Sequence, residues 1–420
     1  MKIQRAYRTE LYPTDDQVRH FVKACGISRF AYNWALERKE TAFREHSLNR
    51  SILSLKNELN RRKPKEFPWM YEASKCVPEE ALWDLDKAYR NLFRHLRGDK
   101  ESGLTTPTVC KECKAPRFGP HIGRPAFKTK RRGLGSFRIE GHRVRVYADC
   151  VQIPLLGVVR LKERGYVPWE DISILSATVS ERAGRWFVSI NVVQNIAVPT
   201  NNGPEAGMDL GVSALATLSD RTAFENPKGL TRHERRLKRL QRSVSRKQKG
   251  SNNRGKAVHR LARAHRRIAN IRRDALHKMT TKLAKNYSII GMEALNVKGL
   301  MRSGFAKGIQ DASLGEVRRQ LGYKTRWFGS RIVIADRFHP SSQLCSNCGG
   351  RKQMPLHARV YHCPSCGFVD DRDHNAAVNL EPRRLVAVGS PETLNACLSR
   401  EVQAAGSVPD HDAGIIVDFK

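Results

Sequence analysis

The spacing of apolar residues divides the first half of the chain into a helical stretch and a strand-rich stretch. Residues 14–98 repeat apolar positions at helical spacing, most clearly in 78–97. Residues 1–12 alternate in the manner of an edge strand, and 136–196 contain short alternating segments separated by Gly and charged turns. We therefore expect a helical unit and a small antiparallel barrel, to which residues 1–12 add a strand.

The helical unit carries three local signals. Thr14 and Gln17 are placed as a capping box at its start, and Gly26 separates two helical runs. Its aromatic residues are interleaved with Arg and could stack nucleobases, although aromatic positions at helical spacing more often form a core. These residues are Tyr32, Trp34, Trp69 and Tyr89.

Two apolar strands in the second half of the chain each contain one acid. Asp209 lies within 206–220, where a buried strand turns into a second strand. Glu293 lies within 288–297, where it follows the apolar residues Ile289, Ile290 and Met292. A carboxylate in an apolar strand is costly unless it is paired or bound to a metal, although either acid alone could be a salt-bridged strand end.

The most basic stretch, 228–278, lies between these two strands. Its apolar spacing predicts a helical hairpin broken at Lys249–Gly255. Charge runs are usually solvated faces, but this one contains almost no compensating acid, which favours contact with nucleic acid. Further on, 307–329 have a helical pattern, 331–336 have a strand pattern, and 391–420 lose periodicity as a disordered tail does.

Composition narrows the class of partner. The 420 residues include 76 Lys and Arg against 41 Asp and Glu, a net charge of +35 that favours a polyanion, with a membrane surface as the runner-up. No apolar run approaches the ~18–20 residues that span a bilayer, and the mean hydropathy is −0.54. With ten cysteines and no secretory signal, we expect a cytoplasmic protein of two to four domains.

Four of the cysteines have the spacing of a zinc site. Cys345 and Cys348 form one CxxC unit, and Cys363 and Cys366 form another after fourteen intervening residues. Two such units can close a tetrahedron around zinc, and Gly349 and Gly367 follow them where the chain must turn sharply. Four reduced core cysteines or a disulfide pair are weaker alternatives.

A loop rich in Gly, Pro, Lys and Arg occupies 99–135. Its segment FKTKRRGLGSF resembles a loop that lies along phosphates. Cys110 and Cys113 form another CxxC, and with His121 they could supply part of a second zinc site without an evident fourth ligand. An unligated or redox-sensitive loop is the alternative.

Three acids, Asp370, Asp371 and Asp373, precede or open the helical segment NAAVNL. Such a group is usually a helix cap. Together, however, Asp209, Glu293 and Asp373 form a plausible trio for phosphodiester cleavage, because carboxylates suit Mg or Mn and two such ions ~3.5–4 Å apart can assist hydrolysis. No Ser or Cys nucleophile with a His partner competes as strongly.

Several segments in this order resemble the TnpB family of insertion-sequence proteins, which are RNA-guided endonucleases related to type V CRISPR effectors. They are GMDLG, GMEALNV, CSNCG, CPSCG and DRDHNAAVNL. The resemblance implies that Asp209, Glu293 and Asp373 are metal-binding catalytic acids and that the four cysteines bind zinc. Asp373 matches the position directly before xNAA better than Asp371 does. The insertion-like VCKECKAPRFGPHIG departs from the family.

The resemblance also implies a fold, a set of domains and partners. The expected fold is α+β and multidomain, with a small antiparallel barrel, an inserted helical lobe, and an RNase H-like (RuvC) nuclease domain with an inserted zinc ribbon. The corresponding ranges are 1–13 and 99–198 (barrel), 14–98 (helical lobe), 199–340 and 368–390 (nuclease), 341–367 (ribbon) and 391–420 (tail). A guide RNA from the element end would pair with double-stranded target DNA beside a short motif, in a prokaryotic cytoplasm at the nucleoid. The expected nucleic-acid contacts are Lys128, Lys130, Arg131, Arg132, Arg235, Arg236, Lys238, Arg239, Arg266 and Arg267.

The sequence is also compatible with three alternative functions. A miniature type V CRISPR effector would have a repeat array beside its gene, and a non-cleaving RNA-guided repressor should lack one of the acids. An RNA-binding zinc-ribbon protein would show no magnesium-dependent cleavage. A direct transposase is disfavoured because no HUH pair with a catalytic tyrosine is evident, and Arg372 either assists catalysis or faces solvent.

Overall fold

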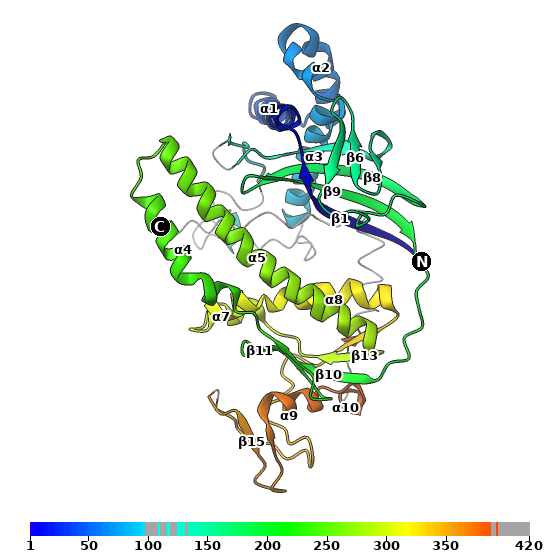
Figure 1. Cartoon of the computed structure of the whole chain (residues 1–420), viewed down its shortest axis with the longest axis vertical. Coiled ribbons are helices and arrows are strands. Elements are labelled where there is room, and N and C mark those ends of the chain that lie inside the picture. Colours follow the sequence, from blue (N-terminus) through cyan, green and yellow to red (C-terminus); the bar gives the residue numbers. More distant parts are fainter. Residues whose placement is uncertain are drawn as a thin grey trace. The chain divides into compact units, whose positions relative to one another are not determined.

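The chain is described here by a computed structural model that covers most of its length. The described residues are 1–96, 108–109, 116–117, 124–130, 133–355, 357–387 and 392–393. Contacts divide the chain into two units, Met1–Ile196 and Ala197–Lys420, and each is described by itself (Figure 1). Cys110, Cys113, His121, Arg131 and Arg132 lie outside the described residues.

The first unit contains a seven-stranded antiparallel sheet with the strand order β4-β8-β9-β1-β7-β6-β5. The alternating segments therefore form strands as predicted. Residues 1–12 form a strand with neighbours on both sides, so the expectation of an edge strand was wrong, although only Leu11 and Tyr12 pair with β7. The strands are β1 (Lys2–Tyr12), β4 (Ser136–Glu140), β5 (Arg145–Val146), β6 (Cys150–Ile153), β7 (Gly157–Leu161), β8 (Ile172–Arg182) and β9 (Arg185–Asn195). Two short strands, β2 (Thr108–Val109) and β3 (Pro116–Arg117), pair with each other.

The helices of the first unit are α1 (Asp15–His46), α2 (Ile52–Glu66) and α3 (Cys76–Leu96), with 3-10 turns at Pro68–Glu72 and Gly141–Arg143. The capping box of Thr14 and Gln17 is confirmed. The predicted break at Gly26 is wrong, because α1 continues through it. One interior Gly costs only about 1 kcal/mol, which burial of neighbours such as Phe21 and Ile27 offsets.

The aromatic residues of this unit divide between its core and its surface. Tyr32 and Trp34 are buried in a core that the helices share with the sheet. Trp69 is partly exposed and packs edge-on against Phe30, with ring centroids 5.0 Å apart. The expectation that aromatic positions form a core is therefore confirmed for Tyr32 and Trp34.

The second unit is built on a mixed sheet with the order β12-β11-β10-β13-β14-β17. Its central strands β10, β13 and β14 are parallel, and the others are antiparallel to their neighbours. The strands are β10 (Glu205–Asp209), β11 (Ala214–Leu218), β12 (Ala223–Glu225), β13 (Ile289–Met292), β14 (Arg331–Ile334) and β17 (Glu392–Thr393). The last strand falls in the range expected to be a disordered tail, whose remaining residues lie outside the described part of the chain.

Helices cover both faces of this sheet (Figure 1). Helices α5 (Asn252–Asn286) and α8 (Leu314–Phe328) lie on one face, and α9 (Arg372–Asn379) and α10 (Pro382–Ala387) lie on the other. Because side chains alternate along a strand, Met208 and Met292 pack in the core under α5 and α8. The positions of Gly207 and Gly291 face the other side of the sheet, where a Cβ at either residue would meet backbone atoms at the end of α9.

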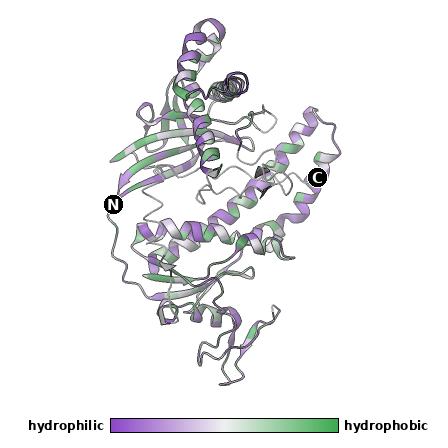
Figure 2. Ribbon diagram, turned by 180° about the vertical axis from the view of Figure 1, so that it is seen from behind, coloured by the Kyte–Doolittle hydropathy of each residue, from purple (hydrophilic) through white to green (hydrophobic). Residues whose placement is uncertain are grey.

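The basic stretch forms the predicted hairpin of α4 (Gly229–Ser245) and α5, with the connection at 246–251, slightly earlier than expected. Ser251 caps α5, and hydrophilic residues run along much of the hairpin (Figure 2). A residue from another helix caps the first turn of α4, because both carboxylate oxygens of Asp311 accept from Leu230 N at 3.0 Å. Arg272 of α5 pairs with the same carboxylate at 2.7 Å, which fixes the base of the hairpin.

The predicted single helix over 307–329 is two helices. Helix α7 (Ala306–Ala312) ends at Ser313, whose φ of 53° is left-handed, and α8 begins directly after it. A short helix α6 (Val297–Leu300) precedes α7. Two ribbon strands, β15 (Val360–His362) and β16 (Val369–Asp371), pair antiparallel. None of the helices in the described ranges combines the length and the apolar run that a membrane span requires.

Candidate functional site

Strand register places Asp209 and Glu293 beside each other. Strands β10 and β13 are parallel with Met208 opposite Met292, so the next residue on each strand is one of the two acids. Neighbouring strands lie ~4.8 Å apart, and both acids stand at the carboxyl ends of their strands. Two acids that are 84 positions apart in the sequence are therefore adjacent.

Two glycines allow α9 to lie directly on these strands. A Cβ at Gly207 would approach Ala377 O to 1.9 Å, and a Cβ at Gly291 would approach Leu380 O to the same distance. Each glycine precedes its acid by two positions, so the alternation of the strand puts glycine and acid on one face. Helix α9 therefore brings Asp373, in its first turn, to the end of the sheet where the other acids lie.

The electrostatics of Asp209 reflect this crowding. Desolvation first, and then the neighbouring charges of Glu293 and Asp373, raise the pKa of Asp209 to about 8, against the opposing effect of Arg372. The pKa of Asp373 is also raised, first by desolvation and then by Asp371. Carboxylates that disfavour each other's ionised form provide a site for cations.

The other two acids of the segment 370–374, Asp370 and Asp371, have structural partners. Asp371 caps α9, because its side chain accepts from Asp373 N at 2.9 Å and from His374 N at 3.1 Å. Asp370 accepts from the ring of His374 at 2.5 Å. Arg359 Nη1 of the ribbon lies 3.9 Å from Asp373 Oδ2, so a cation from outside the helix faces this acid.

His374 connects α9 to strand β10, a contact that the sequence did not suggest. Its Nε2 lies 3.1 Å from Ser219 O, and Ser219 is bonded to both backbone groups of Gly207 at 3.0 and 3.1 Å. These bonds link the residue after Asp373 to the residue two before Asp209. The only sequence signal was the i, i+4 spacing of Asp370 and His374 near the start of a helix, which indicates the contact between these two residues.

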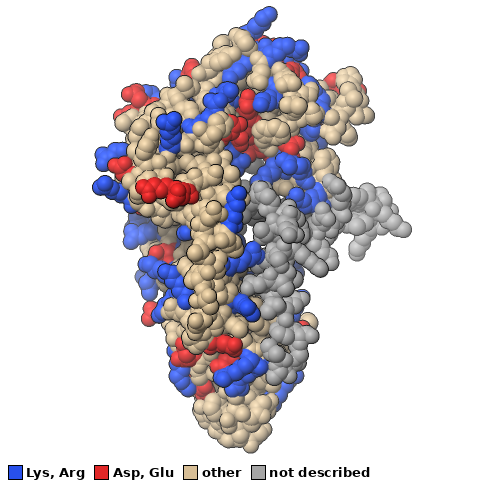
Figure 3. All heavy atoms as spheres, turned by 90° about the vertical axis from the view of Figure 1, so that its right-hand side faces the viewer, with Lys and Arg blue, Asp and Glu red and all other residues tan. Residues whose placement is uncertain are grey.

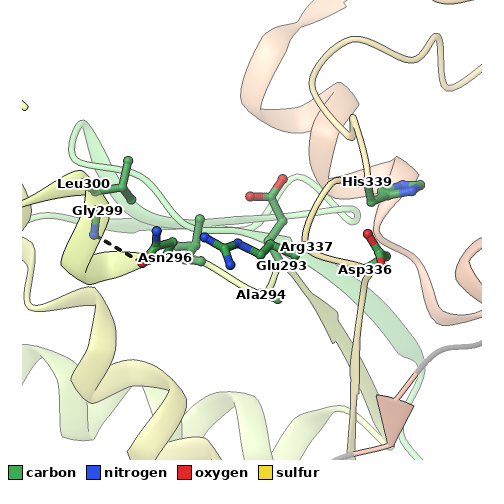
Figure 4. A pocket seen from close by; sticks show the side chains of 9 residues that line it. Glu293, Ala294, Asn296, Gly299, Leu300, Asp336, Arg337 and His339 are labelled. Atoms are coloured by element: carbon green, nitrogen blue, oxygen red, sulfur yellow. Dashed lines mark hydrogen bonds between the residues drawn. The ribbon is translucent and has the colours of Figure 1, made fainter. Parts of the chain in front are cut away.

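Glu293 opens onto a pocket of about 250 Å³ beside the loop that follows β14. Ser341, which is buried, donates a hydrogen bond to Glu293 Oε1. Figure 4 shows the Glu293 carboxylate between Asn296 on one side and Asp336 and His339 on the other. No sequence pattern had assigned this loop to the site, although a polar segment directly after a buried strand is a common place for a site.

The four predicted zinc ligands converge in the ribbon. All four Sγ atoms lie within 4.8 Å of one another, and the Cys345–Cys366 and Cys348–Cys363 pairs are 3.7 and 3.6 Å apart. A regular tetrahedron with Zn–S bonds of ~2.3 Å has edges of ~3.8 Å, so the cluster fits zinc. The four thiols influence one another: the backbone N–H of Cys366 lowers the pKa of Cys363 to about 6, whereas contacts with Cys366 and Cys363 raise the pKa of Cys348.

The asparagines of NAAVN attach the ribbon to α9. Asn375 accepts from Ser346 N at 2.9 Å and donates to Leu344 O at 2.7 Å, and Asn379 donates to the same carbonyl at 2.7 Å. Arg372 donates to Pro355 O at 3.2 Å and to Ala358 O at 3.4 Å. The helix that carries Asp373 is therefore fastened to the first cysteine knuckle.

Known proteins resemble the chain along nearly its whole length. A "Putative RNA-guided DNA endonuclease" of Streptomyces pristinaespiralis is 33% identical over 92% of this chain and 90% of its own length. The chain belongs to the TnpB family. The "Putative RNA-guided DNA endonuclease InsQ" of Escherichia coli K12 is 29% identical over 90% of this chain and 92% of its own length. The resemblance to TnpB found in the sequence is thus confirmed.

Three family models match parts of this TnpB-family chain. One described as "Probable transposase" matches 177–304, one described as "Cas12f1-like, TNB domain" matches 315–380, and one described as "Helix-turn-helix domain" matches 1–47. The last stretch consists here of β1 and the single helix α1. A solved mini-RNA-guided endonuclease, CRISPR-Cas_phi3, aligns over 93% of both chains with 10% identity and a TM-score of 0.41. The family assignment therefore depends on the sequence relatives.

The predicted nucleic-acid contacts of this family member differ in their surroundings. Lys128 Nζ lies 4.0 Å from the centroid of the Tyr32 ring, and desolvation lowers the pKa of this lysine. Its backbone is bonded to the Asn33 side chain, because Lys128 N donates to Asn33 Oδ1 at 2.8 Å and Asn33 Nδ2 donates to Lys128 O at 2.9 Å. Arg266 is half-buried. All the other described members are exposed: Lys128, Lys130, Arg235, Arg236, Lys238, Arg239 and Arg267. Figure 3 shows Lys and Arg spread over one face of the molecule, with fewer Asp and Glu.

Proposed function

We propose that this chain is an RNA-guided DNA endonuclease of a transposable element. The observation that supports it most is the placement of three carboxylates by strand register and by the two glycines under α9. The names of the relatives point to the same activity. In this proposal Asp209, Glu293 and Asp373 are the catalytic acids.

Divalent magnesium or manganese would be held by these three acids. Such ions, when bound, activate the attacking water and stabilise the leaving oxygen of a phosphodiester. The residues present fit this role, because the carboxylates raise the pKa of Asp209 and a cation relieves their repulsion. Zinc would have only a structural role, in the four-cysteine cluster.

The surrounding side chains position these acids. Ser341 orients Glu293 through its hydrogen bond, and Asp371 fixes the first turn of the helix that carries Asp373. Arg359 brings a positive charge to the edge of the site, where a DNA phosphate must arrive.

Guide RNA and double-stranded target DNA are the proposed partners. The net charge of +35 and the exposed basic residues of α4 support binding of many phosphates, and base pairing by the guide would supply sequence specificity. The finer architecture remains part of the proposal: a barrel formed by 1–13 and 99–198, a recognition lobe over 14–98, and a RuvC-type nuclease over 199–340 and 368–390 that encloses the ribbon 341–367.

The test begins with the RNA that accompanies the protein. The chain is expressed with its native flanking DNA, and the RNA that copurifies is sequenced and reprogrammed to a chosen duplex. We expect one RNA species that ends outside the element, and magnesium-dependent cleavage of the matched duplex that is absent in Asp373→Ala. Random cellular RNA without metal-dependent cleavage would show that the chain is only a basic nucleic-acid binder.

A further inference from the structure

The turn that follows β14, which helps to line the pocket of Glu293, displays an exposed aromatic side chain. Phe338 is 85% exposed, the highest value among the large hydrophobic residues of the described chain. The guanidinium of Arg337 lies 5.7 Å from the centroid of its ring. Single exposed apolar residues are common, so exposure alone says little. The position of this one matters because Asp336, Arg337 and His339 line the pocket that contains Glu293.

The turn holds Phe338 in a defined place. Phe338 N donates to Asp336 Oδ1 at 2.8 Å, and His339 N donates to Asp336 O at 3.1 Å. Ser341 N donates to His339 O at 3.0 Å, while its hydroxyl bonds Glu293. The ring is therefore presented from a turn that is tied directly to a proposed catalytic acid. Little conformational freedom would be lost when a ligand meets it.

One residue that lines the pocket, His339, also carries a polar atom without a partner among the described residues. His339 Nε2 is buried and makes no hydrogen bond to any described residue. Arg337, Asn296 and His339 give the walls a polar character that suits the sugar and phosphate of a nucleotide (Figure 4).

We propose that Phe338 is a base-stacking subsite for the strand being cut. An unpaired nucleobase next to the scissile phosphate stacks on the exposed ring, and the backbone of that nucleotide lies against Arg337 and His339. The base must be unpaired, because a base within a duplex already has both faces stacked. This inference rests on the proposed nuclease function and adds that Phe338 binds one unpaired base of the strand being cut.

The experiment uses the guide-loaded protein and a matched target whose region around the cut is unpaired. A series of substrates carries one abasic nucleotide at successive positions near the cut. The variants are Phe338→Ala, Phe338→Trp, which keeps an aromatic face, and the matched control Phe305→Ala, since Phe305 is also exposed and lies in the same unit. Cleavage rates are measured under single-turnover conditions with saturating magnesium.

We expect wild type to lose about 10-fold in rate at one abasic position only, as loss of one stacked base implies. Phe338→Ala should lose about the same factor on intact DNA and be insensitive to that position. Phe338→Trp and Phe305→Ala should keep the wild-type dependence on position. The amount of copurified guide RNA reports whether each variant is folded.

Two results would overturn the subsite. One is wild-type cleavage by Phe338→Ala on intact DNA, and the other is a Phe338→Ala rate that still falls at the same abasic position. Failure of the nuclease proposal is recognised separately, because wild type would then leave every substrate uncut, as Asp373→Ala does.

Discussion

At the scale of single residues, Asp209 bears the electrostatic cost of bringing three acids together. Its pKa of about 8 in the folded chain is far above the ~3.9 of an unfolded Asp, so the ionised form destabilises the fold. This penalty is absent below pH ~4, grows as the pH rises toward 8, and is complete above it. Metal-free protein is therefore expected to lose stability over that interval.

Asp209→Asn should remove this loss. In magnesium-free buffer at pH 8 we expect the variant to gain ~2 kcal/mol after allowance for solvent screening, or ~5 °C in the melting temperature of the second unit. At pH 4 the two proteins should melt together, and magnesium should stabilise only wild type appreciably. Thermal melts at intervals from pH 4 to 9 would measure this. A difference that is constant with pH would show that the charge of Asp209 is not its cause.

His374 offers a prediction about position, because it links the α9 start to Ser219 and Gly207. His374→Phe removes both hydrogen bonds and keeps a ring of similar size. We expect cleavage to fall ~10–100-fold, as for other residues that orient metal ligands, with half-maximal activity at higher magnesium. His374→Gln, which retains a donor, should lie between the two. Equal magnesium dependence in all three proteins would contradict this role.

The residue scale also shows where sequence reasoning ends. Asp209 and Glu293 are visible in the sequence because an acid in an apolar strand is costly unless it has a partner. The roles of Ser341 and His374 could not be inferred from the sequence, because a serine or a histidine in a polar segment is common. Their roles come from contacts with residues 48 and 155 positions away.

At the scale of elements, the site depends on how closely α9 approaches the sheet. Gly207→Ala or Gly291→Ala would place a Cβ 1.9 Å from a backbone oxygen of the helix end, so the helix must move. A displacement of ~1 Å at a catalytic group can cost ~100-fold in rate. We expect both variants to lose cleavage by at least this factor while they still bind guide RNA, as measured by single-turnover assays and RNA recovery.

Gly255→Ala in α5 is the matched control. No atom lies within 4 Å of a Cβ added there, and Ala favours a helix over Gly by about 1 kcal/mol. This variant should therefore cut at the wild-type rate and melt slightly higher. If the two strand variants also cut normally, α9 is not held by its contact with the glycines.

Most helices and strands could be predicted from the spacing of apolar residues alone. The errors in helix boundaries have local causes. The strands and the basic hairpin have strong patterns over many residues. The break at Gly26 was expected from propensity, which the apolar face of α1 overrides. The break at Ser313 was missed because this residue adopts a left-handed backbone although it is neither Gly nor Asn, so its residue type does not mark the end of a helix.

At the scale of the whole molecule, charge and family could be inferred from sequence, but convergence of the acids could not. The three acids span 165 positions, and no periodicity says which distant strands pair in parallel. The register of β10 with β13 and the approach of α9 supply that information. The positive charge, by contrast, is a property of composition, and it leads to a prediction that needs no detail of the site.

Binding of guide RNA should depend steeply on salt, because each neutralised phosphate releases counterions. Arg235 and Arg239 are exposed one turn apart on α4, and the double change to Gln should reduce the slope of log affinity against log salt by ~1.5–2. Arg383→Gln is the control, since Arg383 pairs with Glu381 at 2.8 Å, and it should leave the slope unchanged. Filter binding from 50 to ~300 mM salt would measure both. An unchanged slope in the double variant would mean that this face of the hairpin does not touch the RNA backbone.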